Sequence, residues 1–205
     1  MSFFKENRTA GIALMVLGAI NLIVGLVALV TALTAGNIVV SAVVACIGPI
    51  IMAALYLRFG ISVKNGGVPK KIDILAYFVR LAGLSEIIIA VFNLWYAIET
   101  SGAVVAIGAV IISVIIGLII LFIAGRINDG RQDTGDKIIW IILVVLFAIS
   151  AVLDVLAVIG FITDGNFAFD LKTISALIVP IASFIIDVFM LLLLFDSDVK
   201  REMNM

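Results

Sequence analysis

The chain of 205 residues contains no histidine and only one cysteine, Cys46. A single cysteine excludes a disulfide within the chain, and the lack of histidine excludes the His/Cys clusters that hold metal ions. The lack of histidine also excludes Ser–His and Cys–His catalysis. With neither a metal cluster nor an activated nucleophile, the sequence predicts a protein that is not an enzyme and that needs no metal or cofactor.

Charge is also scarce. Only 13% of the residues are charged, and the formal net charge is −1. Apolar residues make up 64% of the chain, and the mean hydropathy is +1.36. A soluble domain has roughly 45–50% apolar and about 25% charged residues. The composition therefore predicts an integral membrane protein that has the lipid bilayer as its surroundings and no nucleic-acid partner.

The apolar residues gather in six runs, each long enough to cross a bilayer as a helix, which takes about 20 residues. The predicted spans cover residues 9–34, 38–58, 73–98, 102–125, 137–162 and 172–195. Little sequence remains between them for a soluble domain. The expected fold is an all-α integral membrane protein with six transmembrane helices, forming one transmembrane domain over residues 1–205.

Lysine and arginine are distributed unevenly about these spans. Eleven of them flank the side of the membrane that holds the N-terminus: Lys5, Arg8, Arg58, Lys64, Lys70, Lys71, Arg126, Arg131, Lys137, Lys200 and Arg201. Only Lys172 flanks the other side, and Arg80 lies inside the third span. Because basic loops stay in the cytoplasm, we expect a protein of the cell membrane with both termini cytoplasmic.

Small residues recur along the first and third spans with a period of seven. The first span carries Gly11, Gly18, Gly25 and Ala32, and the third carries Ala76, Gly83, Ala90 and Ala97, 65 positions later. Such stripes indicate close helix packing. The offsets predict three tandem αα-hairpins over residues 9–65, 73–130 and 137–198, as parallel internal repeats around a pseudo-threefold axis. A chance register between Gly- and Ala-rich helices is the alternative.

Four charged side chains lie away from the ends of the predicted spans: Arg80, Glu86, Asp154 and Asp187. Asp187 is eight residues from the end of the sixth span, about 12 Å deep at 1.5 Å per residue, and Arg80 is about 10 Å deep in the third. Since a charge inside a bilayer needs a partner, matching depth and opposite sign predict an Arg80–Asp187 ion pair. Glu86 and Asp154 are left without a basic partner.

Glu86 and Asp154 each share a helix face with another polar group. Glu86 lies on one face with Asn93, and Asp154 lies on one face with Ser150. If the repeats turn these faces inward, Asn21, Glu86 and Ser150 surround one polar centre, with Asp154 one turn away. The alternative is that each acid is protonated and only packs helices together.

Two functions are compatible with this sequence. In the first, the polar centre binds or transports a proton, a cation or a small cationic solute, with Glu86, Asp154, Asn21, Asn93 and Ser150 as binding residues. In the second, the chain is a non-transporting accessory or assembly subunit of a membrane complex. A homo-oligomer or a membrane partner subunit is consistent with either function.

Overall fold

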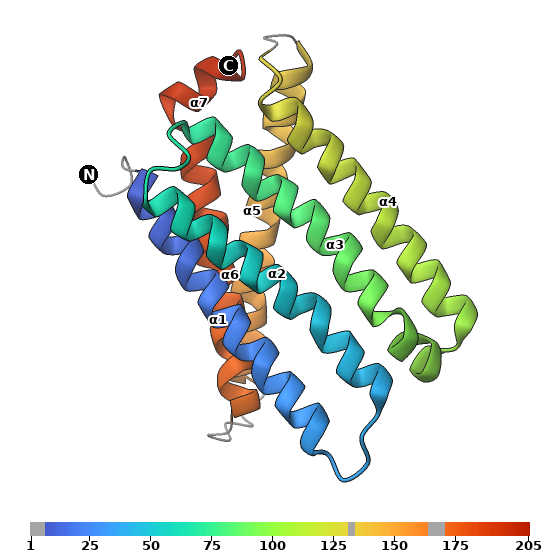
Figure 1. The fold of residues 1–205 in the computed structure, drawn as a ribbon. Helices are drawn as coiled ribbons and strands as arrows, with labels where there is room; N and C mark the ends of the chain where they lie inside the picture. The colour runs from blue at the N-terminus through green and yellow to red at the C-terminus, as the bar shows by residue number, and fades with distance from the viewer. Residues whose placement is uncertain (1–6, 131–133, 164–170) are drawn as a thin grey trace.

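A computed structural model describes residues 7–130, 134–163 and 171–205, apart from the side chains of residues 171–176 and 182. All regular elements in these ranges are helices (Figure 1). They are α1 (Asn7–Thr34), α2 (Val40–Lys64), α3 (Lys71–Ser101), α4 (Ala103–Ile127), α5 (Thr134–Thr163), α6 (Leu171–Leu194) and α7 (Ser197–Glu202).

The six long helices confirm the six predicted spans, since each is long and apolar enough to cross a membrane. Their ends differ from the prediction where polar residues continue a helix beyond its apolar part. The second helix was predicted to end at residue 58, but it continues to Lys64. The third was predicted to begin at residue 73, but it begins at Lys71. The short helix α7 was not predicted. Its N-cap is Asp196, whose carboxylate accepts a hydrogen bond from the backbone N–H of Asp198.

The helices pack in the order α4–α3–α2–α1–α6–α5, so the chain neighbours α1/α2, α3/α4 and α5/α6 all lie side by side. Contacts between α4 and α5 are few. Figure 1 shows α4 and α5 close together at the end where α7 lies, and diverging toward the opposite end. The arc of six helices is therefore incompletely closed between α4 and α5.

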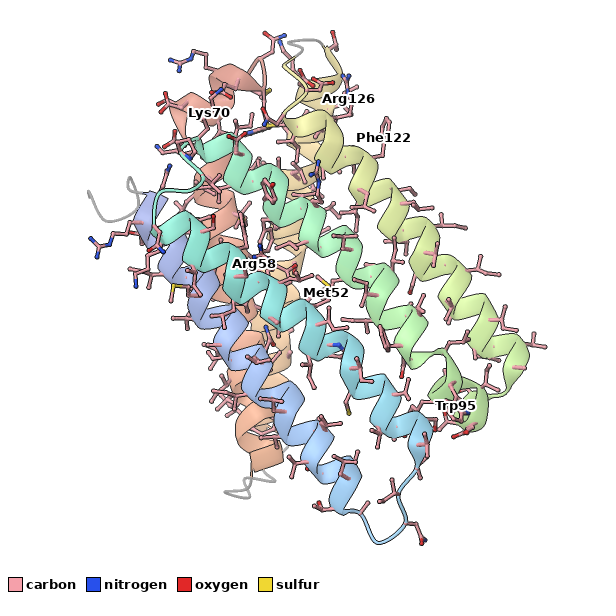
Figure 2. The ribbon with its side chains drawn as sticks, viewed as in Figure 1. Met52, Arg58, Lys70, Trp95, Phe122 and Arg126 are labelled. Carbon is pink, nitrogen blue, oxygen red and sulfur yellow. The ribbon has the colours of Figure 1, made fainter. Side chains whose placement is uncertain are left out.

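The most completely buried residues gather at the end of the bundle that holds α7. Leu75 of α3, Met190 and Leu194 of α6 and Val199 of α7 are all fully buried. Basic residues surround the same end, and Figure 2 shows Lys70 and Arg126 there. We call it the basic end.

Polar contacts tie the helices together at the basic end. The Lys71 ammonium pairs with Asp196, and the Arg126 guanidinium lies 3.6 Å from the buried carboxylate of Asp136. The indole N–H of Trp140 donates to the carbonyl oxygen of Leu194 at 2.8 Å. These contacts join α3 to the segment before α7, α4 to α5 and α5 to α6, so this end of the bundle is closed.

The glycines at the predicted heptad spacing lie where helix backbones touch. A Cβ added at Gly18 of α1 would overlap the backbone of Leu57 in α2. A Cβ added at Gly83 of α3 would lie 2.9 Å from the carbonyl oxygen of Gly117 in α4. The packing interpretation of the small residues is therefore correct at these positions, because any larger side chain would separate the helices.

Candidate functional site

A deeply buried carboxylate in the interior of a membrane-length helix belongs to Asp187, on α6. Its residue is 6% exposed, and its Oδ2 atom has no hydrogen-bond partner. Asp187 lies near Ser150 and Asp154, both on α5. A buried carboxylate oxygen without a donor is costly in an apolar interior, so this atom marks a place where a positively charged or proton-donating ligand would be stabilised.

Asp187 lines a cavity of about 510 Å³ between α2, α3, α4, α5 and α6, which we call the carboxylate cavity. Its polar lining residues are Tyr56, Ser85, Glu86, Ser150, Ser183 and Asp187. Its apolar lining residues are Phe78, Val79, Ala82, Ile120, Ile123, Leu143, Leu146 and Phe147. None of the described lining residues is basic, so nothing among them balances the two carboxyl groups.

Glu86 faces this cavity from α3, opposite Asp187 of α6. Unlike Asp187, Glu86 is exposed, because α4 and α5 diverge and leave that side of the cavity uncovered. Tyr56 of α2 interacts electrostatically with both acids. The cavity thus places one exposed acid and one buried acid on different helices, with a phenol near both.

Asp154 is the neighbour of Asp187 rather than part of the cavity wall. It is half-buried on α5 and lies near Ser183 and Asp187. Its Oδ2 atom also lacks a hydrogen-bond partner. Two carboxyl groups this close repel each other when both are ionised, so a shared proton or a bound cation would stabilise the pair.

A second cavity, of about 580 Å³, adjoins the first; we call it the asparagine cavity. Asn21 of α1 and Asn93 of α3 line it, together with Cys46 of α2. Tyr56 and Ser85 line both cavities. Along α3 the carboxylate cavity extends from Phe78 to Glu86 and the asparagine cavity from Ser85 to Tyr96, so the two follow one another along the bundle.

The structure divides the single polar centre that the sequence predicted. Glu86 and Ser150 line the carboxylate cavity, whereas Asn21 and Asn93 line the asparagine cavity. The physical reason is the helix order. Because α1 packs between α2 and α6, Asn21 reaches the asparagine cavity beside α2 and does not line the cavity between α3 and α5.

The predicted ion pair between Arg80 and Asp187 is not formed in the structure. The Arg80 side chain is exposed, and its guanidinium lies 5.7 Å from the ring centroid of Tyr77. Depth along a helix does not fix the direction in which a side chain points. Six residues separate Arg80 from Glu86, which turns the two about 120° apart around α3. With Glu86 facing the cavity, Arg80 faces away from Asp187.

Sequence reasoning missed three polar residues that line the carboxylate cavity: Tyr56, Ser85 and Ser183. One signal was present, since Ser183 precedes Asp187 by four residues and so shares its helix face. No periodic pattern distinguished Tyr56 or Ser85. Within the described ranges, no three acidic or cysteine side chains converge closely enough to hold a metal ion.

No protein-family model, no curated protein and no solved structure matches this chain.

Proposed function

We propose that the protein binds a proton, a cation or a small cationic solute in the carboxylate cavity and carries it across the membrane. The observation behind this proposal is the buried carboxylate of Asp187, whose Oδ2 atom has no partner and which lines a cavity together with Glu86. Ionisable groups within membrane spans are costly, and they commonly mark ion or substrate pathways.

The position of the two cavities supports transport rather than binding alone. They share Tyr56 and Ser85 and together line α3 from Phe78 to Tyr96. Phe78 and Tyr96 are eighteen positions apart, about 27 Å along a helix, which is close to the hydrocarbon thickness of about 30 Å. A solute that enters the asparagine cavity would pass Tyr56 to reach Asp187, and the closed basic end would then have to open to release it.

Glu86→Gln tests this function. We expect the variant to fold like the native protein and to lose about 10- to 150-fold of cation-dependent proton flux, since a hydrogen bond to a charged group contributes about 1.5–3 kcal/mol. The measurement is dye-detected pH change inside proteoliposomes under sodium, potassium or choline gradients. Glu99→Gln is the matched control, because Glu99 lies on the same helix, binds Ser41 and lines neither cavity.

The alternative function, an accessory or assembly subunit, predicts a different outcome. The native protein would then give no flux under any gradient, and Glu86→Gln would leave stability equal or higher because a costly ionisable group is gone. Equal flux in Glu86→Gln and native protein would also contradict the proposed role of the carboxylate cavity.

The proposal includes an orientation: the protein lies in the plasma membrane, and both of its termini are in the cytoplasm. It is supported by the basic residues around one end of the bundle. In a Cys46→Ser background, we expect Asn37→Cys to react with a membrane-impermeant maleimide added to intact cells. We expect Asn65→Cys to react only after the cells are opened. Both asparagines are exposed and follow the ends of α1 and α2. The reverse labelling pattern would refute this orientation.

The proposal also includes three hairpins as internal repeats. Gly18 and Gly83, 65 positions apart, each contact the helix that follows their own. Glu86 and Ser150, 64 positions apart, both line the carboxylate cavity. Duplication of one hairpin would explain why polar groups from different helices face a common space.

A further inference from the structure

The wall of the carboxylate cavity contains three aromatic rings in addition to its acids. Tyr56, Phe78 and Phe147 all line it, from α2, α3 and α5. The ring centroids of Tyr56 and Phe78 are 5.8 Å apart, and those of Phe78 and Phe147 are 6.0 Å apart. The rings therefore form a continuous aromatic row across three helices, on the wall of the cavity that holds Glu86 and Asp187.

Acids and aromatic rings together are the groups that bind organic ammonium ions. A carboxylate supplies the opposite charge, and the face of an aromatic ring attracts a cation electrostatically without a hydrogen bond. A divalent metal ion instead needs several oxygen ligands around one point. No such cluster occurs in the described residues, and aliphatic side chains make up much of the remaining wall.

The dimensions also suit an organic solute. A volume of about 510 Å³ lies within the range of about 300–1,000 Å³ typical of sites for small organic molecules. A proton or a bare alkali ion would not use the space or the apolar walls. An alkylated ammonium ion would bury its carbon groups against Ile120, Leu143 and Leu146 while its charge is balanced by Glu86 and Asp187.

We infer that the ligand of the carboxylate cavity is a small organic ammonium ion, bound by Glu86 and Asp187 and by the aromatic row of Tyr56, Phe78 and Phe147. This inference rests on the proposed function and specifies its substrate class. Asp187 balances the charge from the buried side of the cavity, Glu86 does so from the exposed side, and the rings contact the alkyl groups on the nitrogen.

Binding of choline to the purified protein, measured by titration calorimetry, tests the inference. We expect choline to bind and its uncharged carbon isostere, 3,3-dimethylbutan-1-ol, to bind at least tenfold more weakly. Phe147→Leu keeps an apolar side chain and removes the ring, so we expect choline affinity to fall about 2- to 30-fold. Phe122→Leu is the matched control, because Phe122 is 71% exposed on α4 and points away from the bundle (Figure 2).

The outcomes separate this inference from the proposed function. If choline and its isostere bind equally, or if Phe147→Leu and Phe122→Leu bind choline equally well, the organic-cation inference is wrong. In that case Glu86-dependent proton or sodium flux would still support the proposed function. If the native protein carries no cation at all, both are wrong. Should Phe147→Leu fail to fold, the choline–isostere comparison and Tyr56→Leu provide the same test.

Discussion

Replacing Asp187 by asparagine is expected to weaken cation binding in the carboxylate cavity by at least about 30-fold. Asparagine has nearly the same shape, so the cavity would remain, but the buried charge opposite the ligand would be gone. Loss of one partner of a buried charge pair costs about 2–5 kcal/mol, which corresponds to a loss of affinity of about 30-fold to several thousand-fold. Titration calorimetry with choline, and sodium-dependent proton release from the protein in detergent, would measure it.

Stability should change in the opposite direction to affinity. Asp187 lacks a basic partner, and its Oδ2 atom lacks a donor, so Asp187→Asn removes a destabilising charge and should leave the melting temperature in detergent unchanged or higher. Asp198→Asn is the control, because Asp198 is exposed and pairs with Arg201 at the basic end. Binding within threefold of native in Asp187→Asn would show that Asp187 does not face the ligand. If Asp187→Asn instead lowers stability, and adding Arg80→Gln recovers part of that loss, the result would support the Arg80–Asp187 ion pair predicted from the sequence.

Gly18→Ala is expected to destabilise the protein by separating α1 from α2. The added Cβ would overlap the backbone nitrogen and Cα of Leu57, and backbone atoms cannot rotate aside as a side chain can. The two helices would have to separate, and overpacking of this kind costs about 1–3 kcal/mol. Thermal unfolding in detergent, followed by circular dichroism, would measure the loss.

Gly108→Ala is the matched control and has the opposite expected sign. Nothing lies within 4 Å of a Cβ added at Gly108, which is in the interior of α4. Alanine there should stabilise the helix by up to about 1 kcal/mol, because it restricts the unfolded chain and favours helix. If both variants unfold at the same temperature, α1 and α2 are not in backbone contact at Gly18.

The sequence predicted the elements of this fold better than their arrangement. Hydropathy identifies six spans because a bilayer imposes a minimum apolar length on each helix. It fixes neither how far polar residues extend a helix, as at Lys64, nor which helix packs beside which. Along one helix, the heptad spacing identified Gly18 and Gly83 as contact positions, since a packing face depends only on local periodicity.

The candidate site was also predicted only in part, because local periodicity shows which residues share a helix face but not what that face packs against. Glu86 and Ser150 were expected to share a polar space and both line the carboxylate cavity. Arg80 was wrongly predicted to pair with Asp187, because equal depth in the membrane does not determine the direction in which a side chain points around its helix. Tyr56 joins the two cavities only through the packing of α2 on α3, which no pattern within α2 reveals.

Because α4 and α5 make few contacts, the bundle is weakly packed between these two helices. The four helices α1 to α4 form a continuous slab, and the pair α5 and α6 attaches to it mainly along α1. The carboxylate cavity lies between these two parts, with Glu86 on the slab and Asp187 on the pair. Rigid rotation of the pair would change the separation of the two acids without bending any helix. Lateral pressure from a surrounding bilayer would act on the same rotation, so bilayer thickness and composition would alter the width of the carboxylate cavity.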